Sequence, residues 1–200
     1  MPTTSNMENV NGIVISGAIP ESHTLLRTAT ASSSSTLSFT SRIDSTFDVY
    51  EFHFTNMHPA TNGSEFSFQV NAAGASGFNE TITSTYFSAY QNESGSSTAL
   101  AYDGGYDQAQ GTAYQNLTQN IGNDNDQSCS GMLTLYAPSS TTYVKHFVSK
   151  VQESQQNDYS IVAFAAGYIN VTAPIDEISF KFDSGNIDAG QIKMYGVATS

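Results

Sequence analysis

Residues 178–183 read Ile-Ser-Phe-Lys-Phe-Asp, so an apolar side chain stands at every second position. The same alternation occurs in residues 66–70, Phe-Ser-Phe-Gln-Val. Successive side chains of a β-strand point to opposite faces, so this period places the phenylalanines on one face and the polar residues on the other. The two segments therefore predict antiparallel strands whose aromatic face lies in a core.

Short apolar runs bounded by turn residues extend this pattern along the chain. Residues 47–54 are dense in aromatics, and their apolar parity changes between Val49 and Tyr50, which indicates a β-bulge or burial on both faces. The most apolar run, 159–171, predicts a crowded central strand, with a buried helix as the alternative. Residues 95–111 and 122–130 are rich in Gly and polar residues and predict loops.

These segments predict eight to ten strands and no amphipathic helix. A chain of 200 residues with such strands fits a single antiparallel β-sandwich, with a jelly roll as the preferred type. Residues 1–24 are polar apart from Ile13-Val14-Ile15 and predict an extended N-terminal arm, with a disordered tail as the alternative. Residues 25–200 are expected to form the sandwich domain.

Charged residues make up only 12% of the chain, and 18 Asp and Glu against six Lys and Arg give a net charge of −12. Nucleic acids and anionic membrane surfaces both bind clustered cations, so neither is an expected partner. No apolar run approaches the roughly 18 residues of a spanning helix. Residues 1–8 lack the charged and apolar regions of a secretion signal.

The single cysteine, Cys129, excludes an intrachain disulfide, and we interpret it as an unreactive loop or edge residue. The four histidines, His23, His53, His58 and His146, are too scattered to predict the converging ligands of a zinc site. No cofactor is expected, and folding is expected to be independent of metal. We expect His58 to hydrogen-bond a loop and His146 to lie on a strand face.

Two loops hold acidic pairs: Asp103 and Asp107 flank Gly104-Gly105-Tyr106, and Asp124 and Asp126 stand in an Asn-rich turn. Paired carboxylates serve glycoside hydrolysis where they converge across a cleft, and Asp and Asn oxygens are ligands that Ca²⁺ prefers. Solvated turn residues are the simpler interpretation of both pairs. With no Gly-x-Ser-x-Gly elbow and no nucleotide-binding glycine motif, the sequence predicts a protein that is not an enzyme.

Five tyrosines are candidates for an interaction surface, because their amphipathic rings stack on sugars and fill protein interfaces. They are Tyr86, Tyr90, Tyr102, Tyr106 and Tyr114. Packing within the sheets is the alternative, and it is expected for more than half of them. Ile13, Val14 and Ile15 are the remaining candidates, because a short apolar run in an arm adds a strand to a neighbour's sheet edge.

Several segments together resemble a family of phage-encoded proteins that is common in marine bacteriophages. The segments are 30–35 with Leu37 and Phe39, 43–50, 54–59, 111–112, 131–133, 138–142 with 144–147, 166–168, 184–190 and 192–197. They span roughly residues 25–197, so the arm lies outside the resemblance. The resemblance implies a virion-associated protein, and it brings neither an established activity nor any catalytic residue.

The sequence thus predicts a non-enzymatic structural protein of a phage virion, made in the host cytoplasm. It would be an accessory or decoration protein on the head or tail surface, in contact with other virion proteins. Uncovered sheet edges invite association, so a homo-oligomer is expected, with a trimer as the first choice. The alternative is a receptor module of a tail fibre or spike that binds a host surface glycan through residues 84–116. An enzyme acting on surface polysaccharide is the least favoured interpretation.

Deletion of residues 1–24 tests the role of the arm. Ordering each residue costs roughly 1–2 kcal/mol of backbone entropy, and this arm has little apolar surface to offset that cost. We expect the truncated domain to keep its melting temperature and to lose oligomerisation or incorporation into particles, measured by light scattering and by particle composition. Unfolding of the truncated monomer, or full assembly without the arm, would contradict the prediction.

Overall fold

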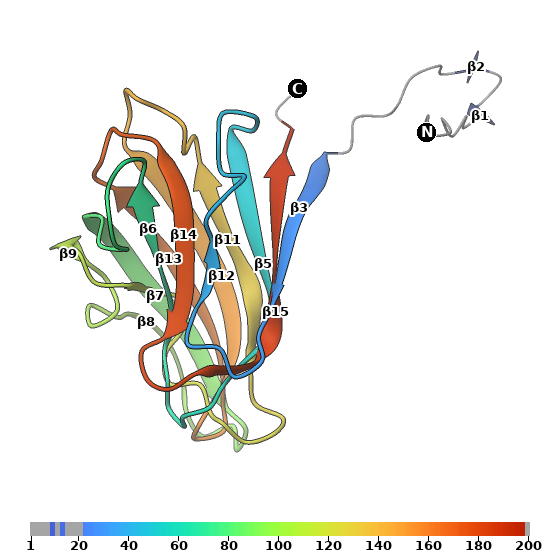
Figure 1. Cartoon of the computed structure of the whole chain (residues 1–200). Helices are drawn as coiled ribbons and strands as arrows, with labels where there is room; N and C mark the ends of the chain where they lie inside the picture. Colours follow the sequence, from blue (N-terminus) through green and yellow to red (C-terminus); the bar gives the residue numbers. More distant parts are fainter. Residues whose placement is uncertain (1–8, 11–12, 15–21, 199–200) are drawn as a thin grey trace.

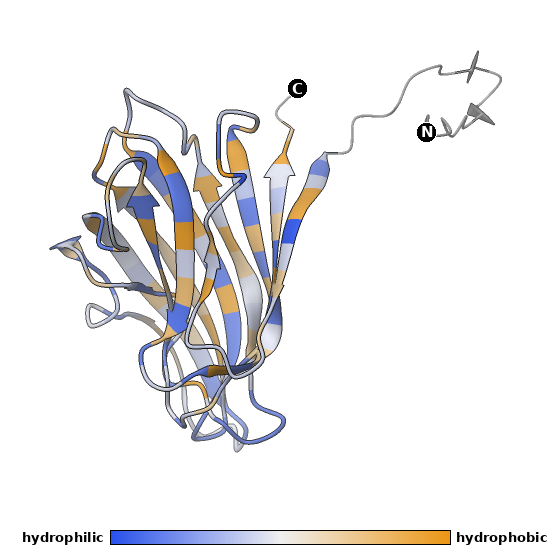
Figure 2. Ribbon diagram, in the orientation of Figure 1, coloured by the Kyte–Doolittle hydropathy of each residue, from blue (hydrophilic) through white to orange (hydrophobic). Residues whose placement is uncertain are grey.

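Alternation of apolar and polar residues produces strands along the chain, and these strands form two antiparallel sheets that pack face to face (Figure 1). The computed structural model describes residues 9–10, 13–14 and 22–198. Hydrophobic and hydrophilic bands alternate along the strands, as the period of two requires (Figure 2). The predicted β-sandwich is confirmed, and the described residues contain no helix.

The larger sheet has nine strands in the order β3-β15-β5-β11-β12-β13-β7-β8, and β9 pairs with β7 off this path. Long strands with regular antiparallel registers form its centre, where β12 and β13 pair along their whole length. The strands are β3 (His23–Thr30), β5 (Val49–Pro59), β7 (Ile82–Asn92), β8 (Thr98–Tyr102), β9 (Ala109–Gly111), β11 (Cys129–Tyr136), β12 (Lys145–Gln155), β13 (Tyr159–Ile169) and β15 (Ile187–Val197).

The smaller sheet has four strands in the order β10-β6-β14-β4. Its strands are β4 (Leu37–Phe39), β6 (Phe66–Ala72), β10 (Gln115–Asn116) and β14 (Ile175–Phe182). The two segments with the clearest alternation, β6 and β14, are neighbours, and Phe180 stands opposite Phe68. Residues on both faces of β6 are buried, because other segments of the chain cover its outer side. Gln69 donates hydrogen bonds to the carbonyls of Glu80, Thr112 and Ala113 in these segments.

A cluster of phenylalanine rings joins the two sheets. The Phe180 ring lies 5.5 Å from Phe52 and 5.2 Å from Phe54 of the larger sheet. On its own side it stacks on Phe66 at 5.9 Å. Edge-to-face and offset aromatic pairs add to the free energy of burying the rings, so this cluster holds the sheets in one relative position.

The inner face of β7 is covered by residues 103–121 instead of by a central strand of the smaller sheet. We name this stretch the coil segment, because it is irregular apart from the short strands β9 and β10. The Ser84 hydroxyl donates to the Gln115 side chain at 2.6 Å, and the Tyr106 ring lies 5.2 Å from the ring of Tyr86. This segment returns the chain from the edge strands β8 and β9 to the interior. It therefore forms one wall of the space between the sheets.

The expected loop at residues 95–111 is wrong, because it contains β8 and β9, both paired with β7. These short strands are largely exposed, so pairing with a neighbour holds them in place and no hydrophobic face reveals them in the sequence. The number of strands consequently exceeds the expected eight to ten. The run at 159–171 is a strand and not a helix, since β13 covers Tyr159–Ile169.

The parity change at residues 47–54 has a different cause from the one expected. Phe47 precedes β5 and packs with its ring 6.0 Å from Tyr50, while Tyr50, Phe52 and Phe54 point inward in regular register. The irregularity of β5 comes later, at Asn56, which adopts a positive φ of 49°. The predicted bulge is therefore wrong in position.

The predicted arm is described only in part. Ile13–Val14 (β2) pairs with Asn9–Val10 (β1) in a short antiparallel ladder, and Ile15 lies outside the described residues. The larger sheet begins at His23, so β3 includes the last two residues of the expected arm 1–24. A deletion that leaves β3 whole ends at or before residue 22.

Phe180→Ala tests the dependence of the fold on the aromatic cluster. Removing a fully buried phenylalanine forfeits its transfer free energy and leaves a cavity, so we expect a loss of about 3–5 kcal/mol in chemical denaturation. Phe87→Ala is the matched control, because Phe87 is 42% exposed on the outer face of β7 and should cost about 1 kcal/mol or less. Equal losses in the two variants would contradict a central role for Phe180.

Candidate binding site

The inner face of the larger sheet carries polar and aromatic residues near one end of β7, β12 and β13. In the paired strands Gln155 stands opposite Tyr159, and Glu153 stands opposite Ile161. Ile161 in turn stands opposite Tyr90 of β7. Directly opposed residues of an antiparallel pair share a face, so these five side chains lie side by side.

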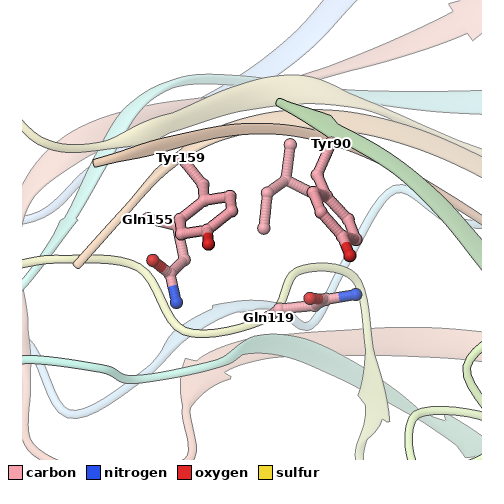
Figure 3. A pocket seen from close by; sticks show the side chains of 5 residues that line it. Tyr90, Gln119, Gln155 and Tyr159 are labelled. Atoms are coloured by element: carbon pink, nitrogen blue, oxygen red, sulfur yellow. The ribbon is translucent and has the colours of Figure 1, made fainter. Parts of the chain in front are cut away.

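A pocket of about 290 Å³ opens at this end of the sandwich. Figure 3 shows that the rings of Tyr90 and Tyr159 and the amides of Gln119 and Gln155 surround it, and Ile161 completes the lining. The two rings meet edge to face, with centroids 5.6 Å apart. Gln119 comes from the coil segment after β10, so the larger sheet forms one wall and the coil forms the other.

Two carboxyl groups stand behind the pocket, and Gln119 contacts both. Its side-chain nitrogen Nε2 donates to Oδ2 of Asp103 at 3.0 Å and to Oγ of Ser88 at 3.1 Å. Its backbone N–H donates to Oε2 of Glu153 at 2.8 Å. Ser88 also donates to Asp103 at 2.6 Å, which completes a closed network. The network fixes Gln119 and therefore the coil wall of the pocket.

Glu153 is fully buried, and burial raises the pKa of its carboxyl from 4.5 to about 8. The negative charge of Glu65 adds to this increase, while hydrogen bonds from the Gln119 backbone and the Thr118 hydroxyl oppose it. The carboxyl is therefore protonated at neutral pH. Its second oxygen, Oε1, has no hydrogen-bond partner among the described residues.

The structure separates the five tyrosines that the sequence singles out. Tyr86 is fully buried, so its expected exposure is wrong; burial and the nearby Glu153 both raise the pKa of its hydroxyl. Tyr106 packs on Tyr86, and Tyr114 lies under the Lys181 ammonium at 4.5 Å. Tyr102 is 61% exposed and hydrogen-bonds Asp107.

Only Tyr90 among these tyrosines lines the pocket. Three other polar residues that line the pocket, Tyr159, Gln119 and Gln155, were not predicted from the sequence. Tyr159 had a detectable signal, because it begins the most apolar run of the chain directly after a turn. The two glutamines stand in polar surroundings and have no distinguishing pattern.

The acidic pairs do not converge as pairs. Asp103 belongs to the buried network with Glu153, while Asp107 accepts a hydrogen bond from Tyr102. Asp124 lies in a turn in which its carbonyl accepts a hydrogen bond from the Gln127 N–H at 2.8 Å. Within residues 9–10, 13–14 and 22–198 no three His, Cys, Asp or Glu side chains are grouped to hold a metal ion.

The remaining candidates are structural. Cys129 is buried at the start of β11, a central strand, so its expected loop or edge position is wrong; burial raises its pKa. The prediction for His58 is confirmed, because its Nδ1 lies 2.7 Å from the carbonyl oxygen of Gln127. His146 is exposed on β12, as expected, whereas the adjacent Lys145 is buried and donates to the carbonyls of Val171 and Ala173.

Two histidines that are distant in sequence meet at one carboxylate on the outward face of the larger sheet. Nε2 of His53 lies 2.8 Å from Oε2 of Glu51, and Nε2 of His23 lies 3.2 Å from the same oxygen. The ring of Tyr195 packs on His53 with centroids 4.9 Å apart. Antiparallel pairing of β3, β15 and β5 brings these side chains together.

Comparison with protein-family models, with curated proteins and with solved structures finds no match for this chain. Among the described residues no helix is long and apolar enough to cross a membrane.

Glu153→Gln tests the buried carboxyl through the pH dependence of stability. The folded carboxyl keeps its proton up to about pH 8, whereas the unfolded one releases it near 4.5. The folded state therefore binds more protons in this window, and its stability falls as pH rises, by at most about 1.4 kcal/mol per unit from this group. Urea denaturation from pH 4.5 to 8.5 should show wild type and variant most alike at the acidic end and the variant increasingly more stable at the basic end. Parallel curves would contradict this prediction.

Proposed function

We propose that the outward face of strands β7, β8, β11, β12 and β13 is an interaction surface, because it exposes several large apolar side chains among polar ones. Phe87 and Phe164 stack there with ring centroids 4.9 Å apart, and the Lys150 ammonium lies 5.7 Å from the Phe164 centroid. In these five strands six large apolar side chains are exposed by 36–73%: Phe87, Leu100, Tyr102, Met132, Tyr136 and Val148. We name this the outer face. Large apolar side chains that gather on one exposed face are typical of an interaction site.

The strands of the outer face contribute no acidic side chain to it, and Asp107 reaches only its edge, where it accepts a hydrogen bond from Tyr102. The five strands contain one carboxylate, Glu153, and it points into the sandwich. The chain as a whole has 18 Asp and Glu and a net charge of −12, so its acids are concentrated elsewhere. Two copies can therefore bring their outer faces together without the like-charge repulsion that the rest of their surfaces would cause.

We propose that the protein is a non-enzymatic structural component of a bacteriophage virion that assembles with copies of itself through the outer face. It would be an accessory or decoration protein on the head or tail surface, with a jelly-roll-like sandwich as its scaffold. The single observation that carries the assembly role is the group of large exposed apolar side chains on strands that carry no outward acidic residue. The virion setting rests on the sequence resemblance. Sheet-on-sheet packing at about 10 Å is a common way of burying two such faces.

A second candidate function, a glycan-binding receptor module, is favoured by one specific observation. Tyr90 and Tyr159 present aromatic rings beside the amides of Gln119 and Gln155 in an open pocket. Binding of the purified chain to a glycan array tests this function.

Leu100→Glu and Val148→Glu test assembly through the outer face. Both residues are exposed, at 73% and 48%, so the monomer should fold normally, while a buried unpaired charge opposes association by several kcal/mol. Light scattering should show an oligomer for the wild type and at least about tenfold weaker association for each variant. Tyr143→Glu is the matched control, because Tyr143 is 72% exposed and lies outside these five strands.

A wild type that stays monomeric at about 100 μM, or variants that assemble normally, would contradict self-assembly through this face. Cryo-electron microscopy of intact particles tests the virion setting. If the density shows the outer face packed against a different virion protein, that protein, and not a second copy of this chain, is the partner of the outer face.

A further inference from the structure

The two pocket amides are held in fixed orientations by bonds to the protein. Gln119 uses its Nε2 on Ser88 and Asp103, so its Oε1 is the atom left to accept a hydrogen bond. Gln155 is oriented the opposite way, because its Oε1 accepts the backbone N–H of Asn157 at 2.7 Å, which leaves its Nε2 as a donor. The pocket thus offers one acceptor and one donor that are already oriented, which lowers the entropic cost of binding.

The tyrosine hydroxyls add two further polar groups. Neither the Tyr90 nor the Tyr159 hydroxyl has a hydrogen bond to any described residue, so each can donate and accept toward a ligand. Their ring faces and Ile161 supply apolar surface beside these groups. Such a mixture of flat aromatic surface and alternating donors and acceptors matches a ring that has C–H groups on its face and hydroxyls on its rim.

The pocket lining contains no Asp, Glu, Lys, Arg or His, since tyrosine and glutamine supply its only polar side chains. The carboxylate of Asp103 is occupied by Ser88 and Gln119, and the Glu153 carboxyl is fully buried. An anionic ligand would also meet the repulsion of a chain with a net charge of −12. The chemistry of the site therefore selects a neutral polyhydroxylated ligand.

We propose that this pocket binds one neutral pyranose residue of a glycan. The sugar ring would stack on a tyrosine, and neighbouring hydroxyls would donate to Oε1 of Gln119 and accept from Nε2 of Gln155. A volume of about 290 Å³ lies just below the range of small-molecule sites, about 300–1,000 Å³, which limits the contact to a single sugar unit. This inference rests on the second candidate function and names its ligand class and its site.

The test is titration of the full chain with the methyl glycosides of glucose, galactose, mannose and N-acetylglucosamine, followed by NMR, with N-acetylneuraminic acid as the anionic comparison. We expect at least one neutral glycoside to bind with a Kd on the order of 1 mM, corresponding to about 4 kcal/mol, and the anionic sugar to bind at least tenfold more weakly.

Two variants place the binding in the pocket. Tyr159→Ala removes the stacking ring, and Gln155→Glu keeps the acceptor for the Asn157 N–H but removes the donor; each should weaken binding at least tenfold. Tyr143→Ala, a change of an exposed tyrosine in the 137–144 segment, should bind like the wild type.

The outcomes separate the site from the function. If neither the four glycosides at 10 mM nor a glycan array shows binding, both the site and the glycan-binding function are overturned. Binding that both pocket variants retain keeps the function and overturns the site. Equal or tighter binding of N-acetylneuraminic acid overturns the neutral ligand class.

Discussion

The contact of Phe180 with the rings around it is the constraint on which the remaining structure depends. Its ring touches Phe39, Phe66 and Phe68 of the smaller sheet and Phe52 and Phe54 of the larger one. Close-packed aromatic surfaces tolerate little displacement, so the smaller sheet is positioned over β5, β11 and β12. Four strands cannot cover nine, and the inner face of β7 is therefore left to the coil segment 103–121. The pocket forms where this coil meets the end of the larger sheet.

The sandwich can be predicted from the sequence because a strand buried on one face has apolar residues at every second position. This pattern fails for β8 and β9, which are exposed edge strands held by backbone pairing with β7. Tyr86 shares its parity with the buried Ile82, so the period of β7 predicts the burial of Tyr86. Glu153 stands on the apolar parity of β12, in line with Phe147 and Val151, and this position of an acid was a usable signal of a buried carboxyl. Gln119 carried no such signal, because its position depends on a tertiary contact.

Burying a carboxyl group costs free energy unless the group is neutral or fully hydrogen-bonded. Glu153 is kept neutral by its raised pKa, and one of its two oxygens is hydrogen-bonded. The donor to that oxygen is the Gln119 backbone N–H. Because the same glutamine also holds Asp103, the two acids act together on one residue of the pocket wall. An apolar residue at position 153 would remove the desolvation cost but would leave the Gln119 backbone N–H without this acceptor. The carboxyl is therefore better explained as an anchor for the coil than as a group that meets a ligand.

The two faces of β7 and β13 have opposite chemistry, and this follows from the alternation of a strand. Inward residues such as Ser88 and Tyr90 contact the polar network and the pocket, whereas outward residues such as Phe87 and Phe164 form the apolar outer face. Association through one face leaves the other unblocked, since the pocket lining is built from inward side chains and the coil. A shared oligomer would carry one pocket per copy, and weak binding of single sugar units then becomes stronger through the effective concentration of neighbouring sites. The assembly role and the sugar site are thus compatible, and the first would strengthen the second.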